Sequence, residues 1–203
     1  MRRIPQERRI RVDPKAGRSS ASKRLKGNVQ MDDAYVGGAR SGRRGRGAAG
    51  KTPFVAAIAT TDDGKPDQII LRPVRAFSSF AIRMLASTAL EPGANIVSDG
   101  LACFTAVTQA GCLHSSIKTG SGKQAARTPA FKWVNTALGN IKAALVGTYR
   151  AVREKHVPRY LAEFEYRFNR RYHLETMIPR LAFVALRTAP MPYRLLKLAD
   201  VAA

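Results

Sequence analysis

Residues Phe131 to Tyr149 read FKWVNTALGNIKAALVGTY. In this stretch Asn135 and Lys142 are seven residues apart, about two turns of an α-helix, so both side chains leave the same face. By itself the pattern predicts an amphipathic helix that carries a polar pair. An alternative gives Asn135 a structural role, as the N-cap of a helix that begins at Thr136.

The composition indicates a chain with an anionic partner. Lys and Arg number 35 against 14 Asp and Glu, so the formal net charge is +21, while 45% of the 203 residues are hydrophobic. This length and hydrophobic share predict one globular domain with a core. An excess of positive charge opposes compaction unless anions neutralise it, and nucleic-acid phosphates are the commonest such partner. The alternative is a soluble basic protein without such a partner.

Two cysteines, Cys103 and Cys112, lie among apolar residues. Two thiols cannot form a disulfide framework or a cysteine-rich zinc site, so we expect buried thiols in a reducing compartment. The sequence has no run of the roughly 18 apolar residues that a membrane span needs, and its basic N-terminus lacks the apolar segment of a signal peptide. We therefore expect a cytoplasmic protein without membrane contact.

The order of secondary-structure signals is typical of an α/β fold. Residues 1–26 are rich in Arg, Lys and Ser and are expected to form a disordered basic arm, and residues 27–203 to form one domain. Within that domain, three strand signals precede a helix, a strand, a helix and a strand, and helices follow to the C-terminus. Strands are expected at 28–38, 53–61, 68–77, 94–100 and 113–120. This is the order of the ribonuclease-H-like fold, a mixed five-stranded sheet flanked by helices, here with a helical C-terminal extension.

Two aspartates, Asp32 and Asp99, are expected near the ends of the first and fourth strands. Functional groups gather beyond strand ends in open α/β sheets, so the two carboxylates are expected to converge there. Their oxygens suit Mg²⁺, with water and a substrate phosphate completing the octahedron. A single Asp is more often a cap or turn residue, and strand alternation points Asp33 to the face opposite Asp32.

Five sequence blocks resemble the ISXO2-like insertion-sequence transposases, over residues 26 to 198. They are LKGNVQMDDAYVGG, GRGAAGKTPFVAA, VSDGLACFTAV followed by AGCLH, FKWVNTALGNIKAALVGTY, and RYLAEFEYRFNRR. The separation of Asp99 from Asn135 matches that between the second and third acidic residues of many DDE transposases and integrases. In the resembled family a basic residue follows the third position by seven residues, and one subgroup has Asn there.

The resemblance implies a catalytic set of Asp32, Asp99, Asn135 and Lys142, in which the first three are metal ligands. It implies Mg²⁺ or Mn²⁺, as two ions, and metal-dependent phosphodiester hydrolysis and strand transfer at insertion-sequence ends. A neutral Asn should hold the second ion less tightly than a carboxylate does, and Lys142 should neutralise phosphate charge. The implied partner is DNA, bound by a homodimer that holds two element ends, with bacterial nucleoid association when DNA is bound.

Basic side chains outside the catalytic set are expected to contact DNA phosphates. They are Arg40, Arg43, Arg44, Arg46, Lys51, Lys123, Arg127, Arg167, Arg170 and Arg171. The first five lie in a glycine-rich segment that can follow an irregular surface. The last three flank an aromatic stripe from Tyr160 to Tyr172, which is expected to belong to the core rather than to a base-stacking platform.

The resemblance leaves rival functions. One is a nuclease or resolvase of the same fold that cuts without joining, and another is a catalytically inactive DNA-binding remnant. Related transposases carry an upstream helix-turn-helix or zinc-ribbon region, whereas a basic arm precedes Asp32 here, so weak or absent end specificity is expected. His114 matches a family position and is expected to be structural or to face DNA.

Overall fold

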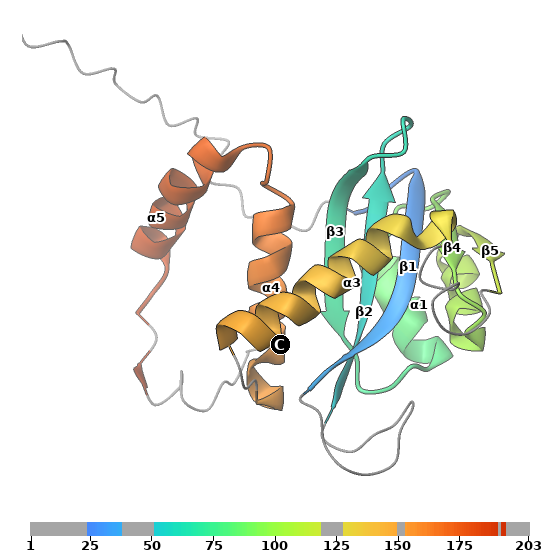
Figure 1. The fold of residues 1–203 in the computed structure, drawn as a ribbon, viewed down its shortest axis with the longest axis horizontal. Coiled ribbons are helices and arrows are strands. Elements are labelled where there is room, and N and C mark those ends of the chain that lie inside the picture. The colour runs from blue at the N-terminus through green and yellow to red at the C-terminus, as the bar shows by residue number, and fades with distance from the viewer. Residues whose placement is uncertain (1–23, 38–50, 119–127, 150–152, 191, 194–203) are drawn as a thin grey trace, which may run out of the picture.

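Five strands form one mixed sheet in the order β3-β2-β1-β4-β5, with β1 at its centre (Figure 1). The computed structural model describes residues 24–37, 51–118, 128–149, 153–190 and 192–193. The strands are β1 (Asn28–Val36), β2 (Thr52–Thr60), β3 (Pro66–Pro73), β4 (Asn95–Ser98) and β5 (Leu113–Ser116). β1, β2 and β3 are antiparallel neighbours, whereas β4 and β5 run parallel to β1. The predicted ribonuclease-H-like α/β architecture is confirmed.

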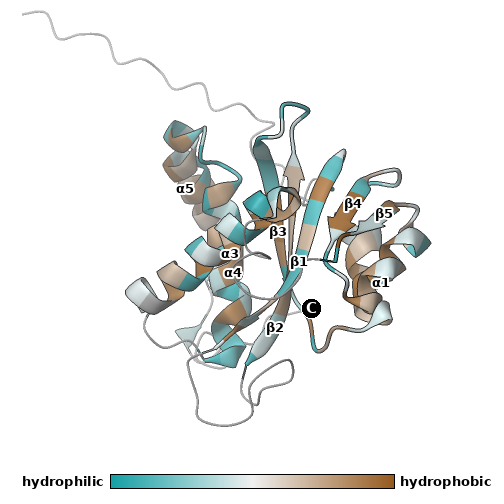
Figure 2. Ribbon diagram, turned by 45° about the vertical axis from the view of Figure 1, so that its right-hand side comes forward, coloured by the Kyte–Doolittle hydropathy of each residue, from teal (hydrophilic) through white to brown (hydrophobic). Residues whose placement is uncertain are grey.

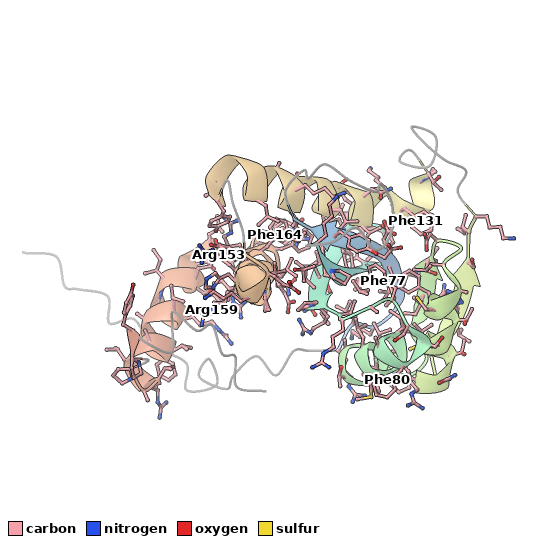
Figure 3. All side chains as sticks on the ribbon, turned by 90° about the horizontal axis from the view of Figure 1, so that it is seen from below. Phe77, Phe80, Phe131, Arg153, Arg159 and Phe164 are labelled. Carbon is pink, nitrogen blue, oxygen red and sulfur yellow. The ribbon has the colours of Figure 1, made fainter. Side chains whose placement is uncertain are left out.

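Helices cover both faces of this sheet. The longer ones are α1 (Ser79–Ala89), the 3-10 helix η2 (Ala102–Ala110), α3 (Lys132–Ala144), α4 (Val157–Phe168) and α5 (Met177–Arg187). The short ones are η3 (Pro129–Phe131), η4 (Leu145–Tyr149), η5 (Glu154–His156) and η6 (Leu174–Thr176). α1 and η2 pack on one face of the sheet, and α3 and α4 pack on the other. Figure 3 shows the two layers, with Phe131 and Phe164 on the α3 side and Phe77 on the α1 side.

β1 contributes side chains to both cores. Val29 and Met31 are buried against α1 and η2, whereas Ala34 and Val36 are buried beneath α3 and α4. Between them, hydrophilic bands interrupt the strand (Figure 2). β2 is buried on both faces, as its continuous apolar run predicts. The polar interruption of β1 therefore lies in the middle of the sheet rather than at its edge.

Local sequence signals set several helix ends. The Ser78 hydroxyl accepts the Ala81 N–H at 3.2 Å and caps α1, and Gly111 ends η2 in the left-handed region with φ of 79°. The helix expected between the fourth and fifth strands is present as the 3-10 helix η2. Residues three apart eclipse one another in a 3-10 helix, which places Phe104 and Val107 on one buried face.

α4 contributes part of the aromatic stripe to the core. Phe164 and Phe168 pack against the α3-side core, with ring centroids 6.3 Å apart. Tyr172 lies beyond the end of the helix and is 70% exposed. The expected core role is thus confirmed for the two phenylalanines, and Tyr172 falls outside it.

The exposed edge of β3 is covered by side chains rather than by another strand. Asn169, directly after α4, accepts the Ile69 N–H at 2.7 Å and donates to the Ile69 carbonyl at 2.9 Å. Glu165 accepts the Leu71 N–H at 2.9 Å and pairs with Arg72 at 2.8 Å. An edge strand otherwise presents unpaired backbone groups that another chain can pair with. The fifth sequence block therefore includes residues that close the sheet.

Asn169→Ala is expected to lower the free energy of unfolding by about 1–3 kcal/mol, because both backbone groups of Ile69 lose their partner. Urea denaturation followed by circular dichroism measures the change. Asn140→Ala removes an exposed asparagine of α3 and should change stability by less than about 0.5 kcal/mol. Equal stability of the two variants would contradict the proposed contribution of the edge contact.

α5 stands apart from both cores (Figure 1). None of its residues is buried, and Ile178 and Leu186 are 78% and 88% exposed. The Tyr166 hydroxyl donates to the Met177 carbonyl at 3.0 Å, which links α4 to the start of α5. Within the described residues, no helix combines the length and apolar character needed to cross a membrane.

Most of the expected basic arm, residues 1–23, lies outside the described residues. Leu25, at the other end of that arm, is buried in the α1-side core with 1% exposure. Its N–H donates to the Ala89 carbonyl and its carbonyl accepts the Glu91 N–H, both at 2.8 Å. Core packing therefore includes Leu25, and the division into an arm and a domain stays a prediction.

Candidate active site

The register of two parallel strands brings Asp32 and Asp99 together. β1 and β4 pair in parallel up to Met31 and Ser98, where β4 ends. The next residue on each chain is an aspartate. The parallel register of the two strands thus places two carboxylates side by side, in the centre of the sheet.

Asp33 joins this pair. One carboxylate oxygen from each of Asp32, Asp33 and Asp99 lies within 4.8 Å of the others, and all three residues are half-buried. Strand alternation predicts that Asp33 points away from Asp32, but β4 stops at Ser98, so its pairing with β1 no longer separates the two faces here. Asp33 could be assigned to the cluster only by knowing that β1 continues past the end of β4. That knowledge depends on the register of the two strands.

Backbone amides orient two of these carboxylates. Oδ1 of Asp32 accepts the Asp33 N–H at 2.8 Å, and Oδ1 of Asp99 accepts the Leu101 N–H at 3.1 Å. The second bond spans the turn that leads from β4 into η2. Asp commonly forms local side-chain to backbone bonds of this kind, and here they restrict the orientation of the two carboxylates.

The pKa of Asp32 is raised from 3.8 to about 7, chiefly by burial and also by the negative charges of Asp33 and Asp99. The Asp33 N–H and the positive charge of Lys142 act in the opposite direction and only partly offset this rise. Asp32 is therefore partly protonated at neutral pH when no cation neutralises the cluster. Mg²⁺ and Mn²⁺ prefer carboxylate oxygens, so the donor set of the cluster fits either ion, and a bound cation favours the ionised carboxylates.

α3 begins against β1, next to the acidic cluster. Gln30, which precedes Asp32 by two residues on the same face of β1, accepts the N–H of Trp133 at 3.0 Å and of Val134 at 3.1 Å. The side chain of Gln30 thereby satisfies amides that a helix start leaves without partners. A residue from the central strand, rather than one from the helix itself, caps α3.

Asn135 lies inside α3, directly after the anchored first turn. The helix begins at Lys132, so the alternative in which Asn135 caps a helix starting at Thr136 is wrong. Asn135 is half-buried, whereas Lys142 is exposed in the last turn. Because the charge of Lys142 lowers the pKa of Asp32, the ammonium group lies within electrostatic reach of the carboxylates. One helix therefore carries both polar residues of the expected pair, and the role of Asn135 as a metal ligand stays a prediction.

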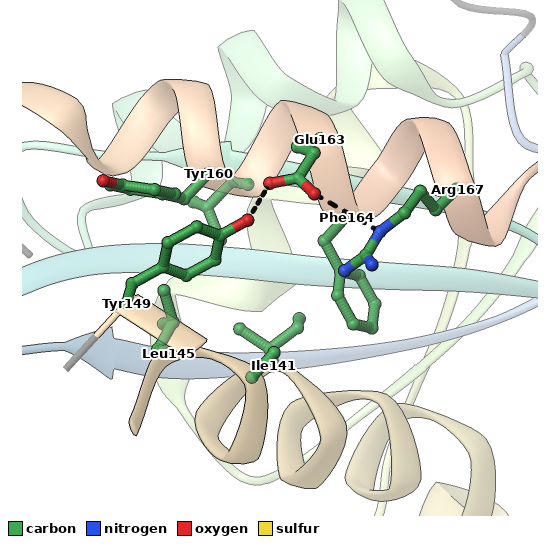
Figure 4. A pocket seen from close by; sticks show the side chains of 9 residues that line it. Ile141, Leu145, Tyr149, Tyr160, Glu163, Phe164 and Arg167 are labelled. Atoms are coloured by element: carbon green, nitrogen blue, oxygen red, sulfur yellow. Dashed lines mark hydrogen bonds and ion pairs between the residues drawn. The ribbon is translucent and has the colours of Figure 1, made fainter. Parts of the chain in front are cut away.

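A π-helical turn, Leu145–Tyr149, follows α3 and joins it to α4. The Tyr149 hydroxyl donates a short hydrogen bond to Glu163, and Glu163 pairs with Arg167 at 3.5 Å (Figure 4). π-helical turns often occur near functional sites. These contacts fix the C-terminal end of the helix that carries Lys142.

The basic residues expected to contact DNA fall into two groups. Those outside the described residues are Arg40, Arg43, Arg44, Arg46, Lys123 and Arg127. Of the others, Lys51 is half-buried directly before β2, and Arg167 is the ion-pair partner of Glu163 on α4. The DNA contacts of both groups stay predictions.

Arg170 and Arg171 make contacts within the protein. The Arg170 guanidinium lies 4.0 Å from the centre of the Tyr166 ring. Arg171 donates to the carbonyls of Pro66 and Asp67, the latter at 2.9 Å, and so joins the end of α4 to the start of β3. A DNA contact from Arg171 would have to share a guanidinium that already holds two segments together.

A family comparison matches the part of the chain that contains this site. A model of the ISXO2-like transposase domain matches residues 24–169. The chain belongs to the ISXO2-like transposase family. The matched region of this transposase runs from the buried Leu25 to the edge-covering Asn169 and includes the acidic cluster and α3, while α5 follows it. Comparison with curated proteins finds no match.

The family match confirms the resemblance to ISXO2-like transposases that the five sequence blocks indicate. It supports a DNA transposase function, and it implies DNA as the partner. Transposases of the DDE type generally use divalent metals, and the cluster of Asp32, Asp33 and Asp99 offers the oxygen ligands that such ions require.

Proposed function

We propose that this ISXO2-like transposase cuts and joins DNA at insertion-sequence ends by metal-dependent phosphodiester hydrolysis and strand transfer. The observation that supports this most is the cluster of Asp32, Asp33 and Asp99 oxygens within 4.8 Å of one another, inside a transposase domain. Two bound Mg²⁺ or Mn²⁺ ions would supply activation of the attacking oxygen and stabilisation of the leaving one.

Asp32 and Asp99 hold the metal from the two central parallel strands, with their orientation set by backbone amides. Asn135 adds a neutral amide oxygen from α3, which contributes a ligand but no charge. Asp33 supplies the carboxylate charge that Asn135 lacks. In this assignment the site has three carboxylates, although Asn135, the third residue of the family's catalytic set, carries an amide.

Lys142 neutralises negative charge on the scissile or a flanking phosphate in the transition state. Its exposure leaves the ammonium group accessible to DNA, and its electrostatic influence on Asp32 supports a position beside the carboxylates. The surplus of basic residues, +21 over the chain, supplies salt-dependent affinity for the DNA backbone. A homodimer on DNA holds the two element ends.

A cleavage and joining assay tests this function. The protein is incubated with supercoiled plasmid and a labelled duplex carrying the DNA that flanks its gene, with Mg²⁺, Mn²⁺ or EDTA. Metal-dependent nicking of the duplex together with labelled plasmid product is the expected result. Nicking without joining would instead identify a nuclease or resolvase, and DNA binding without either reaction in both metals would identify an inactive remnant.

Asp33→Asn is expected to weaken Mn²⁺ binding about tenfold, because the charge of the ligand set is a main determinant of affinity for such ions. Isothermal titration calorimetry at pH 8 measures the dissociation constant. Asp62→Asn, which changes an exposed aspartate in the β2–β3 turn, is the matched control and should leave the affinity within twofold. Unchanged affinity in Asp33→Asn would remove Asp33 from the ligand set.

A further inference from the structure

Ser98 links the acidic cluster to β5. It is the last residue of β4, directly precedes Asp99, and has 0% exposure. Its hydroxyl lies 3.0 Å from the Asp99 carbonyl oxygen and 2.9 Å from Nε2 of His114, on β5. A fully buried hydroxyl is thus placed between the backbone of an expected metal ligand and an imidazole ring.

The donors and acceptors in this chain of contacts can be assigned. The Asp99 carbonyl can only accept, so the single proton of the Ser98 hydroxyl is donated to it. The hydroxyl must then accept from His114, which requires a proton on Nε2. Burial lowers the pKa of His114, which favours the neutral ring, and the contact with Ser98 places the single ring proton on Nε2.

The Asp99 residue is consequently held at two points. Its carbonyl accepts the Ser98 hydroxyl, and the Ser116 hydroxyl approaches the same oxygen at 3.4 Å. Its carboxylate accepts the Leu101 N–H at 3.1 Å. The Asp99 carbonyl is thus held from the sheet, and the Asp99 carboxylate is held from the turn that leads into η2. Because both groups are restrained, the orientation of the peptide unit after Asp99 sets the direction of the carboxylate.

We infer that His114 is a positioning residue for Asp99: its Nε2–H holds the Ser98 hydroxyl on the Asp99 carbonyl and so fixes the carboxylate in the acidic cluster. The contribution to metal binding rests on the proposed function, whereas the hydrogen-bond chain does not. His114 belongs to the AGCLH block and is half-buried on β5, and this positioning role does not require contact with DNA.

Three measurements on this 203-residue chain test the inference. Nitrogen-detected NMR of the imidazole rings is expected to show the Nε2–H tautomer for His114. Hydrogen exchange of the Leu101 amide is expected to accelerate in His114→Ala and to stay near the parent rate in His114→Gln, whose side-chain amide can donate to Ser98. Mn²⁺ affinity is expected to fall about tenfold in His114→Ala, within the range for residues that orient metal ligands, and to recover to within about twofold in His114→Gln.

Two further variants separate positioning from general loss of stability. Ser98→Ala should reproduce the loss in His114→Ala, and the double variant should lose no more than either single one, because both act through one chain of bonds. His173→Ala removes a histidine that is 74% exposed and should leave all three readouts unchanged. Circular dichroism confirms that each variant is folded.

An Nδ1–H tautomer for His114 would overturn the inference. So would equal losses in the Ala and Gln variants, which would make His114 a space-filling residue, or additive losses in the double variant. A parent that binds no Mn²⁺ would defeat the proposed metal-dependent function, and the tautomer and the exchange rate of Leu101 would then still decide the role of His114.

Discussion

Asp32→Asn is expected to reduce metal-dependent DNA cleavage at least about 1000-fold, which corresponds to about 4 kcal/mol of transition-state stabilisation. The substitution keeps the size of the side chain but removes its charge from the centre of the proposed site. Asp99 and Asp33 remain within 4.8 Å of this position, so loss of activity would report the missing ligand charge rather than a collapsed cluster. Initial rates of plasmid nicking in Mn²⁺ measure the effect.

Two further variants serve as controls in the same nicking assay. Asp62→Asn removes an exposed charge far along the chain from the cluster and should nick at the parent rate. Asp99→Ala should lose cleavage as Asp32→Asn does but retain DNA affinity in a gel shift at matched salt, because phosphate contacts supply that affinity. A nicking rate within tenfold of the parent in Asp32→Asn would exclude Asp32 as an essential ligand.

In the metal-free protein, the free energy of unfolding is expected to fall as the pH rises from about 4 to above 7. The pKa of Asp32 is about 7 in the folded chain, against an ordinary value of 3.8, so the folded state binds the extra proton in this interval. Deprotonation leaves a charge that is partly buried beside two other carboxylates. The shift corresponds to a loss of up to about 4 kcal/mol at pH 8, since one pKa unit is about 1.36 kcal/mol.

Denaturant unfolding in EDTA at a series of pH values measures this dependence. Asp32→Asn lacks the titrating group, so it should be more stable than the parent at pH 8 and equally stable near pH 4. Mn²⁺ at pH 8 should restore stability to the parent by binding the folded state, and should do so much less in Asp32→Asn. Parallel pH profiles for the two proteins in EDTA would show that Asp32 ionises freely in the folded chain.

The ionised acidic cluster is expected to destabilise the folded chain until a metal ion binds it. Burial and the neighbouring carboxylates disfavour the ionised form of Asp32, and the positive charge of Lys142 on α3 only partly offsets this effect. Functional sites commonly carry such destabilising features, and a variant that gains stability while losing activity is their usual signature.

Several features of the protein follow from local sequence patterns. The Ser78 cap of α1 and the left-handed Gly111 at the end of η2 each depend on one residue and its neighbours. The apolar, β-favouring run at residues 53–61 predicted the strand β2. Asn135 and Lys142 were placed on one helix by spacing alone, and the five blocks indicated the transposase family that the family model confirms.

Other features depend on contacts between residues distant in the sequence. Gln30, rather than Asn135, caps α3, because β1 passes under the start of that helix. Asn169 and Glu165 close the β3 edge from a helix about a hundred residues later in the chain. Periodicity within α4 could not show which backbone groups these side chains would meet.

The sequence by itself determined the family and the order of strands and helices, and it predicted that Asp32 and Asp99 converge. Only the tertiary structure placed Asp33 within 4.8 Å of them and the Ser98 hydroxyl between Asp99 and His114. The physical reason is the register of β1 against β4. Alternation fixes which face a strand residue points to, but where the neighbouring strand ends decides whether the two faces remain separate, and that is a property of the assembled sheet.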